Sequence, residues 1–186
     1  NEIHAPLEMS STTFHQSNVV PAQFVQGYAE FASGFVPEPL TIPGAFSPMG
    51  GLLSSVADLA KWVAGFQSAW NESSLHPLQK WSRREMQEPQ RHARTAASHD
   101  DHANKIKSIT TSYAFGLMVD GDSILGRFVS HSGGYPGFGS HMRWHPASGW
   151  GIVALGNRTY APMVFAASEA LAMIVRDFVA PKIITE

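Results

Sequence analysis

The segment 128–139 limits the fold more than any other, because a strand-like run leads directly into four closely spaced glycines. Residues 123–130 alternate, imperfectly, in the manner of a strand, and His131-Ser132-Gly133-Gly134 follows at once. Glycines there remove side chains where another group must approach the backbone. Such a strand edge can bind an extended substrate or donate N–H groups to an oxyanion, with His131 at the mouth of the cleft. The alternative is an ordinary tight turn beside a chance histidine.

The C-terminal half predicts an antiparallel meander closed by a helix. Strands at 113–119 and 123–130 flank a turn at Asp120-Gly121, and strands at 141–145 and 150–156 flank a turn at 146–149. Pro162 opens a helix that continues to about Val179 and ends before Pro181, with apolar residues on one face at Val164, Ala167, Leu171, Ile174 and Phe178.

The N-terminal half predicts helices and loops. Ser55 and Asp58 have the spacing of a capping box for a helix at 54–69, in which capping accounts for the aspartate. The expected elements, in chain order, are a helix end and loop at 1–16, irregular chain at 17–46 with extended pieces around 24–28, the helix at 54–69, a second helix at 77–87, and a polar surface loop at 90–110. We therefore expect one α+β domain over 1–186, mainly helix and loop over 1–110 and antiparallel strands plus a closing helix over 111–186.

Composition excludes several classes of partner. The net charge of −2 gives no basic field for nucleic acid. The absence of cysteine excludes disulfides and thiolate metal sites, and no apolar run approaches the roughly 20 residues that span a bilayer.

Nine histidines raise the possibility of a metal site. His141 and His145 share a strand face with Arg143, which would repel a cation, and His92, His99 and His102 lie in the polar stretch. We therefore expect surface histidines, no metal and no other cofactor. Two aromatic residues after the glycines, Tyr135 and Phe138, are candidates for lining a substrate pocket.

Several segments, in this order, resemble the β-lactamase-related serine hydrolases, which include class C β-lactamases, D-alanyl-D-alanine carboxypeptidases and esterases. They are 5–14, 48–59, 82–89, 113–117, 131–134 with 136–137, and the terminal strand and helix. The resemblance implies an antiparallel sheet sandwiched by helices. It implies that His131 binds or polarises the substrate, that the N–H of Gly134 stabilises the oxyanion, and that Ser132 and Gly133 line the cleft.

Two of the three elements that such enzymes use are missing from these 186 residues. No serine has a lysine three positions later, and no tyrosine has asparagine or serine two positions later. Because both elements precede the Pro-Leu-x-Met segment in this family, and that segment starts here at Pro6, we expect the chain to be the C-terminal portion of an acyl-enzyme hydrolase. Alone it should be inactive on amides, lactams and esters.

An alternative is a non-catalytic binding or regulatory module that retains the cleft. In the intact parent the partner is a small-molecule or peptide substrate. The absent N-terminal half would leave a strand edge and apolar surface uncovered, which predicts self-association or binding of a complementary fragment. A bacterial periplasmic or extracellular location is favoured over the cytoplasm.

Overall fold

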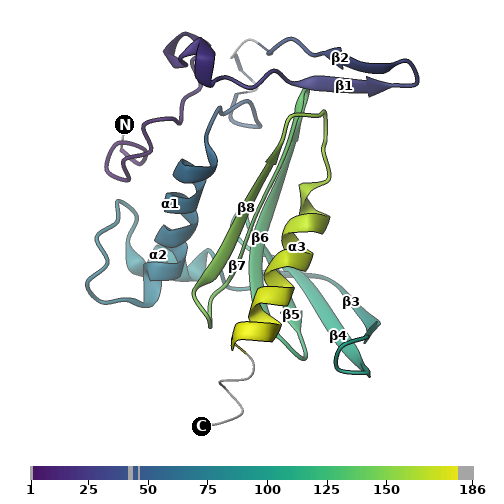
Figure 1. Cartoon of the computed structure of the whole chain (residues 1–186). Coiled ribbons are helices and arrows are strands. Elements are labelled where there is room, and N and C mark those ends of the chain that lie inside the picture. The colour runs from purple at the N-terminus through teal and green to yellow at the C-terminus, as the bar shows by residue number, and fades with distance from the viewer. Residues whose placement is uncertain (1, 42–43, 46, 180–186) are drawn as a thin grey trace.

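A six-stranded antiparallel sheet forms the centre of the protein, and its strands are adjacent in chain order, β3-β4-β5-β6-β7-β8 (Figure 1). The computed structural model describes residues 2–41, 44–45 and 47–179. The strands are β1 (Tyr28–Phe31), β2 (Gly34–Pro37), β3 (Arg91–Asp100), β4 (Lys105–Tyr113), β5 (Met118–Asp122), β6 (Gly126–Tyr135), β7 (Phe138–His145) and β8 (Trp150–Gly156). The helices are α1 (Val56–Gln67), α2 (Lys80–Glu85) and α3 (Met163–Ile174), with 3₁₀ turns at Gln16–Asn18, Pro21–Gln23 and Ser68–Trp70 and a π turn at Val175–Val179.

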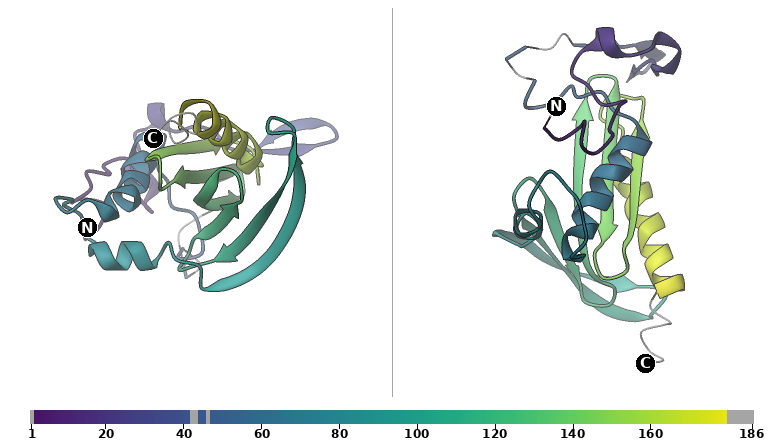
Figure 2. Two further views of the ribbon diagram at one scale, coloured as in Figure 1. Left: turned by 90° about the horizontal axis from the view of Figure 1, so that it is seen from below. Right: turned by 90° about the vertical axis from the view of Figure 1, so that its left-hand side faces the viewer.

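Helices cover both faces of the sheet. The right-hand view of Figure 2 shows α1 and α3 on opposite sides of β6–β8, while β1 and β2 form a separate hairpin beyond one end of these strands (Figure 1). This arrangement confirms the predicted α+β class with an antiparallel sheet flanked by helices.

Successive residues of β6 lie in two separate cores, one on each face of the sheet. Val129 packs with Val63 and Phe66 of α1, whereas Phe128 packs with Leu171 of α3. Because successive side chains of a strand point to opposite faces, this pair fixes which residues of the sheet face each helix. Trp144 is fully buried on the α1 side, where its indole nitrogen donates to Gln87 Oε1 at 2.9 Å and its ring stacks on Phe66.

The start of α1 confirms half of the predicted capping box. The Ser55 hydroxyl accepts from the backbone N–H of Asp58 at 3.2 Å, as the N-cap rule requires. The Asp58 carboxylate does not return to the N-cap. It accepts instead from the backbone N–H of Ser11 at 2.8 Å and from the Thr12 hydroxyl at 2.9 Å. Capping therefore does not account for Asp58, which ties the N-terminal segment to the helix.

The prediction of a polar loop at 90–110 is wrong, as is the division of the chain at residue 110. Residues 91–113 form the β3–β4 hairpin, and β3 is the outermost strand of the sheet. Its residues are exposed on both faces until Asp100, so no alternation marks it as a strand.

Two other turns differ from expectation. Asp120-Gly121 lies inside β5, paired with Phe128 and Arg127. The turn follows it at 123–125, where the Asp122 carboxylate accepts from the N–H groups of Ile124 and Leu125. The region 17–46 contains the β1–β2 hairpin, which starts where the expected extended piece ends.

The last helix begins after Pro162, as predicted, and buries Ala167, Leu171 and Val175. Val175 therefore belongs to the buried row, rather than the predicted Ile174. The Phe178 side chain and Pro181 lie outside the described residues.

A charge cluster joins the β3–β4 hairpin to the body of the protein. Lys107 bridges Asp100 at 3.3 Å and Asp122 at 2.8 Å, and Arg176 binds Asp100 at 3.0 Å. The N–H of Ala103, which donates to Asp100, lowers the pKa of this carboxyl to about 2, with help from Lys107 and Arg176 and against the effect of burial. The ordinary value is 3.8.

This cluster predicts acid sensitivity. A carboxyl with a depressed pKa in the folded state stabilises the fold above its unfolded pKa, and the contribution disappears as pH falls through the folded value. The free energy of unfolding should therefore fall between about pH 4 and pH 2, and Asp100→Asn should flatten that fall. Urea unfolding at several pH values measures this fall. Asp101→Asn, which changes an exposed neighbour, should show the same fall in the free energy of unfolding as the parent protein. An equal fall in the parent and both variants would contradict the role of Asp100.

Candidate functional site

The end of β6 has an open edge. β5 pairs with β6 only as far as Met118, which lies opposite Ser130. Among the described residues, 131–135 therefore pair with β7 alone, from His131 opposite Met142 to Tyr135 opposite Phe138. Backbone N–H and C=O groups on such an edge are free to bind an extended ligand.

The predicted site residues divide between the two faces of this strand. His131 and Tyr135 alternate with Val129 and so lie on the α1 face, whereas Ser132 and Gly134 lie with Phe128 on the α3 face. The segment is thus a strand edge from which the side chains of His131 and Ser132 point to opposite faces of the sheet.

A hollow of about 200 Å³ lies beside this edge. Its lining consists of Ser132, Gly133, Gly134, Ser140 and residues 160–164. Three of the six predicted residues line it, and His131, Tyr135 and Phe138 do not. The other wall of the hollow, the loop into α3, was not predicted as part of the site. The one sequence signal for it is that this loop directly follows the last strand of the sheet.

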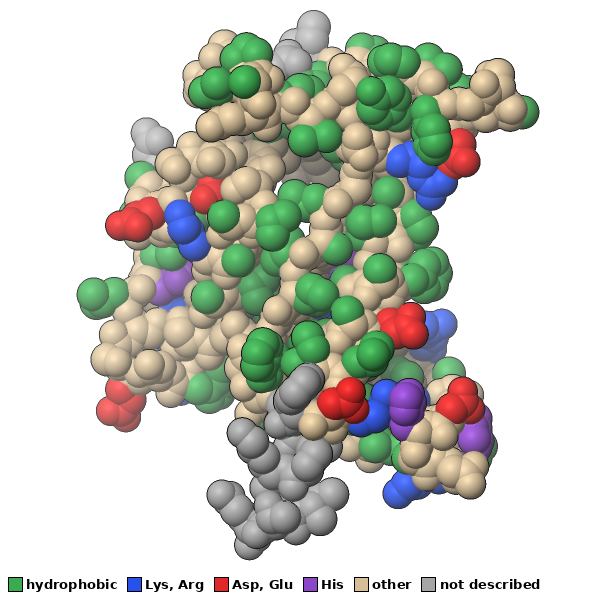
Figure 3. All heavy atoms as spheres, viewed as in Figure 1, with side chains coloured by type: hydrophobic (Ala, Val, Ile, Leu, Met, Phe, Trp, Pro, Cys, Tyr) green, Lys and Arg blue, Asp and Glu red, His purple; other side chains and the backbone are tan. Residues whose placement is uncertain are grey.

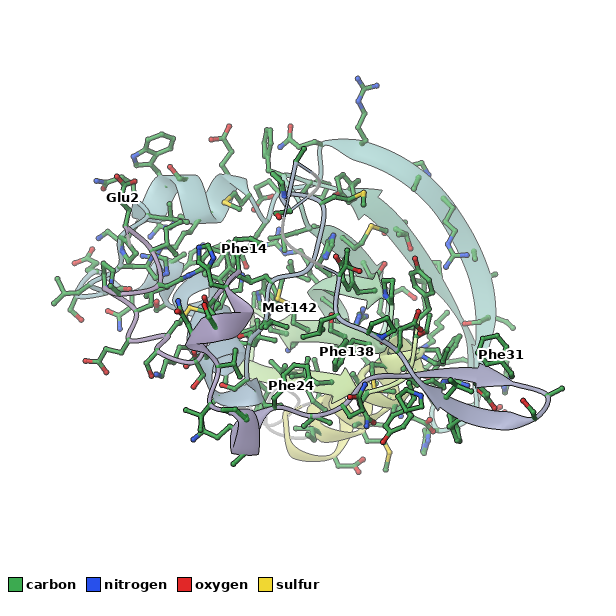
Figure 4. All side chains as sticks on the ribbon, turned by 90° about the horizontal axis from the view of Figure 1, so that it is seen from above. Glu2, Phe14, Phe24, Phe31, Phe138 and Met142 are labelled. Carbon is green, nitrogen blue, oxygen red and sulfur yellow. The ribbon has the colours of Figure 1, made fainter. Side chains whose placement is uncertain are left out.

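Tyr135 and Phe138 contact other loops. The Tyr135 ring lies against Gly50 and Gly51, close enough that a Cβ atom at Gly50 would meet it at 3.0 Å. Phe138 packs edge-to-face on Phe24, with ring centroids 6.2 Å apart. Figure 4 shows these two rings together near the end of the sheet and Phe31 far out on the β1–β2 hairpin. Both rings thus hold the loops that border the open edge.

A row of glycines crosses the sheet beneath the loop that leads into α3. Gly134 pairs with Gly139, and Gly139 pairs with Gly156. A Cβ atom at Gly134 would overlap the Tyr160 ring, and one at Gly139 would overlap the backbone of Ala161. Only glycine lets the loop rest directly on the strands, so this row fixes the wall of the hollow.

Two histidines that were predicted to lie on the surface are buried: His141 is 3% exposed and His145 is 2% exposed. Both point toward the α3 face. The ring nitrogens of His145 contact Ser148 Oγ at 2.8 Å and the Leu125 carbonyl at 2.9 Å. Arg143, between them, binds Asp120 at 2.8 Å. The prediction that these histidines lie on the surface is wrong because α3 covers this face of β7. The sequence of the strand alone does not show which helix covers it.

His141 contacts the predicted site directly. Its Nδ1 lies 2.7 Å from the Ser132 hydroxyl. Burial, followed by the nearby Arg143 and His131, lowers the pKa of His141 to about 4, so the ring is neutral at physiological pH. Within the described residues, no three His, Asp or Glu side chains are grouped so that they could hold a metal ion.

The family model described as Beta-lactamase matches residues 1–175. The chain belongs to the β-lactamase family. Among curated proteins, it is 25% identical over 178 residues to "Unguisins hydrolase ungD'" of Aspergillus campestris (strain IBT 28561), a match that covers 86% of this chain and 28% of that protein.

Solved structures show the same fold. A penicillin-binding protein homologue from Pyrococcus abyssi, described as octameric, matches with a TM-score of 0.74 and 24% identity over 94% of this chain and 36% of that one. A class C β-lactamase matches with a TM-score of 0.63 and 13% identity over 91% and 48%. This β-lactamase-family chain thus spans about a third to a half of these structures. In the part of it that the structure describes, no helix is long and apolar enough to cross a membrane.

Proposed function

We propose that this chain supplies the substrate-binding strand of a serine hydrolase that forms an acyl-enzyme on amide, lactam or ester bonds. The observation that carries the proposal is the open edge of β6 at 131–135, in a chain of the β-lactamase family. A substrate can add to this edge as an extended segment, with its carbonyl beside the glycines.

The family resemblance suggests a role for each residue. The N–H of Gly134 is one of two oxyanion donors, and such a donor typically contributes about 3 kcal/mol of transition-state stabilisation. His131, on the α1 face, binds or polarises the substrate. The nucleophile has to come from polypeptide outside these 186 residues, because no Ser-x-x-Lys is present in them. A serine then attacks the carbonyl carbon, the leaving group departs, and water releases the acyl group.

The two outer edges of the sheet support a second polypeptide segment as partner. The β3 edge is exposed and polar, with Arg91, His92 and Arg94, which discourages pairing. β8, by contrast, is uncharged, has Trp150 49% and Leu155 39% exposed, and lies between α1 and α3. We propose that a strand of the nucleophile-bearing segment adds to β8. A second copy of this chain is the other candidate, as the octameric Pyrococcus relative suggests.

Activity assays on the chain alone and on the assembled protein test the proposal. With nitrocefin as the lactam and 4-nitrophenyl butyrate as the ester, the 186-residue chain should show no turnover above buffer. Co-expression with a family segment that carries Ser-x-x-Lys and Tyr-x-Asn should restore turnover, and replacing that serine with alanine should abolish it. Turnover by the chain alone that is lost when one of its own serines is replaced would refute the proposal.

A further inference from the structure

His141 is buried behind the strand edge, and the one hydrogen-bond contact of its ring within the described residues is to the site. Its Nδ1 lies 2.7 Å from the Ser132 hydroxyl. Its other nitrogen, Nε2, is buried and has no hydrogen-bond partner among the described residues. Ser132 is exposed and lines the hollow beside the loop into α3. The pair therefore connects a buried ring to a hydroxyl that a ligand can reach.

The unpartnered nitrogen determines where the proton of the ring lies. A proton on Nε2 would be a buried N–H donor without an acceptor, the rarest kind of unsatisfied group in folded proteins. A proton on Nδ1 instead donates to Ser132 Oγ and leaves Nε2 as a bare acceptor, which costs less. The Nδ1-protonated tautomer is therefore favoured.

Burial is the main cause of the lowered pKa of His141, and the neighbouring charges add to it. Arg143, on the same face of β7, and His131, on the neighbouring strand, disfavour a second proton, and only Asp120 acts in the opposite direction. Asp120 is already bound by Arg143 and by the Thr111 hydroxyl, each at 2.8 Å. The ring thus remains a single-proton donor to Ser132.

This tautomer fixes the direction of the Ser132 hydroxyl. Because Ser132 Oγ accepts from His141, its own hydrogen has to point elsewhere, and the hollow is the space that this side chain lines. No Lys or Arg of the described residues lines the hollow, and the nearby Arg158 is paired with Glu30. The described side chains of the lining are neutral hydroxyls, those of Ser132, Ser140 and Tyr160, and the apolar groups of residues 161–164. Neutral hydroxyl donors in apolar surroundings suit an uncharged oxygen better than a carboxylate.

We propose that His141 is a positioning residue that holds the Ser132 hydroxyl as a hydrogen-bond donor to an uncharged carbonyl oxygen of a substrate on the β6 edge. The substrate part of this proposal rests on the proposed function, whereas the orientation of the His141–Ser132 pair does not. His141 touches no reacting atom and acts only through Ser132.

Nuclear magnetic resonance of the ¹⁵N-labelled 186-residue chain tests the orientation without any activity. Two-bond ¹H–¹⁵N correlations should show a neutral His141 protonated on Nδ1 at pH 7, assigned by the signals lost in His141→Asn. A proton on Nε2, or averaging between the two nitrogens, would overturn the proposal whether or not the protein is a hydrolase.

A set of variants in the co-expressed assembly tests the substrate part, with 4-nitrophenyl butyrate as probe. His141→Leu and Ser132→Ala should each lower kcat/KM about 10-fold, and the double variant should lose no more than either. His141→Asn, whose amide nitrogen takes the place of Nδ1, should retain most of the activity. Additive losses, or a loss with Asn equal to that with Leu, would contradict the positioning role.

The charge of the substrate is tested separately. The assembly should hydrolyse 4-nitrophenyl butyrate at least 10-fold more efficiently than the matching succinate half-ester, because the part of the chain that the structure describes places no Lys or Arg in the lining of the hollow. The opposite preference would refute the uncharged acceptor. An assembly without any turnover would refute the proposed function and this substrate assignment together, whereas the proton position on His141 would still be decided by the spectrum.

Discussion

Replacing Gly139 with alanine is expected to destabilise the protein by about 3 kcal/mol, at the upper end of the usual cost of overpacking. A Cβ atom there would overlap the carbonyl oxygen of Ala161 and lie 2.5 Å from its nitrogen. These are backbone atoms, so no rotamer change can relieve the collision. The N–H of Ala161 donates to Arg158 and its carbonyl accepts from Met163, so moving this residue would disrupt the entry to α3.

Urea unfolding followed by circular dichroism measures the effect. Gly44→Ala is the matched control, because no atom of the described residues lies within 4 Å of its Cβ position, and it should change stability by no more than about 0.5 kcal/mol. Gly134→Ala should reduce the free energy of unfolding less than Gly139→Ala does. The added Cβ atom at Gly134 meets the side chain of Tyr160, which is 66% exposed and can turn away. Equal stability of all three variants would show that the loop does not rest on the glycine row.

The glycines also show how far sequence reasoning reaches. The pair at 133–134 predicted a close approach to the backbone, and the structure has one. The approaching group, however, is the loop at 160–163, about 27 residues further along the chain, and only the register of β6, β7 and β8 aligns Gly134, Gly139 and Gly156 beneath it. The positions of the glycines in the sequence predict that another group approaches the strand closely. The register of the strands determines which group that is.

Elements with a buried face were the most predictable. The helix at 56–67 and the β7–β8 hairpin carry clear apolar periodicity and turn residues, and both are confirmed. The strand at 91–100 has no buried face before Asp100, so its polar residues looked like a loop. Its partner strand and its charge cluster hold it in place, and neither is visible in local sequence.

The segment that forms the candidate site could be predicted from the sequence, but the directions and contacts of its side chains could not. Residues 131–134 lie on a strand edge as expected, yet His131 and Ser132 face opposite sides of the sheet. The role of His141 depends on two neighbours that the sequence separates: Ser132, nine residues away on the next strand, and α3, which covers it. A histidine in an alternating strand gives no sign of burial until its covering helix is known.

Replacing His131 with alanine is expected to lower kcat/KM of the assembled enzyme about 100-fold, within the range found when a group that stabilises the transition state is removed. The side chain lies on the α1 face at the first residue of β6 that has no partner in β5. In the proposed function a substrate on this edge lies beside the His131 side chain, and because the ring is partly exposed it contributes little to the core. The loss should therefore appear in activity and leave stability within about 0.5 kcal/mol of the parent.

His131→Lys should recover a large part of the activity, because lysine also places a hydrogen-bond donor at this position. His92→Ala is the matched control, since it removes an exposed histidine from the outer strand β3. Rates with 4-nitrophenyl butyrate and unfolding curves for the three variants separate catalysis from folding. If His131→Ala and His92→Ala retain equal activity, then no reacting group passes the open edge of β6, and the substrate has to bind elsewhere on the protein.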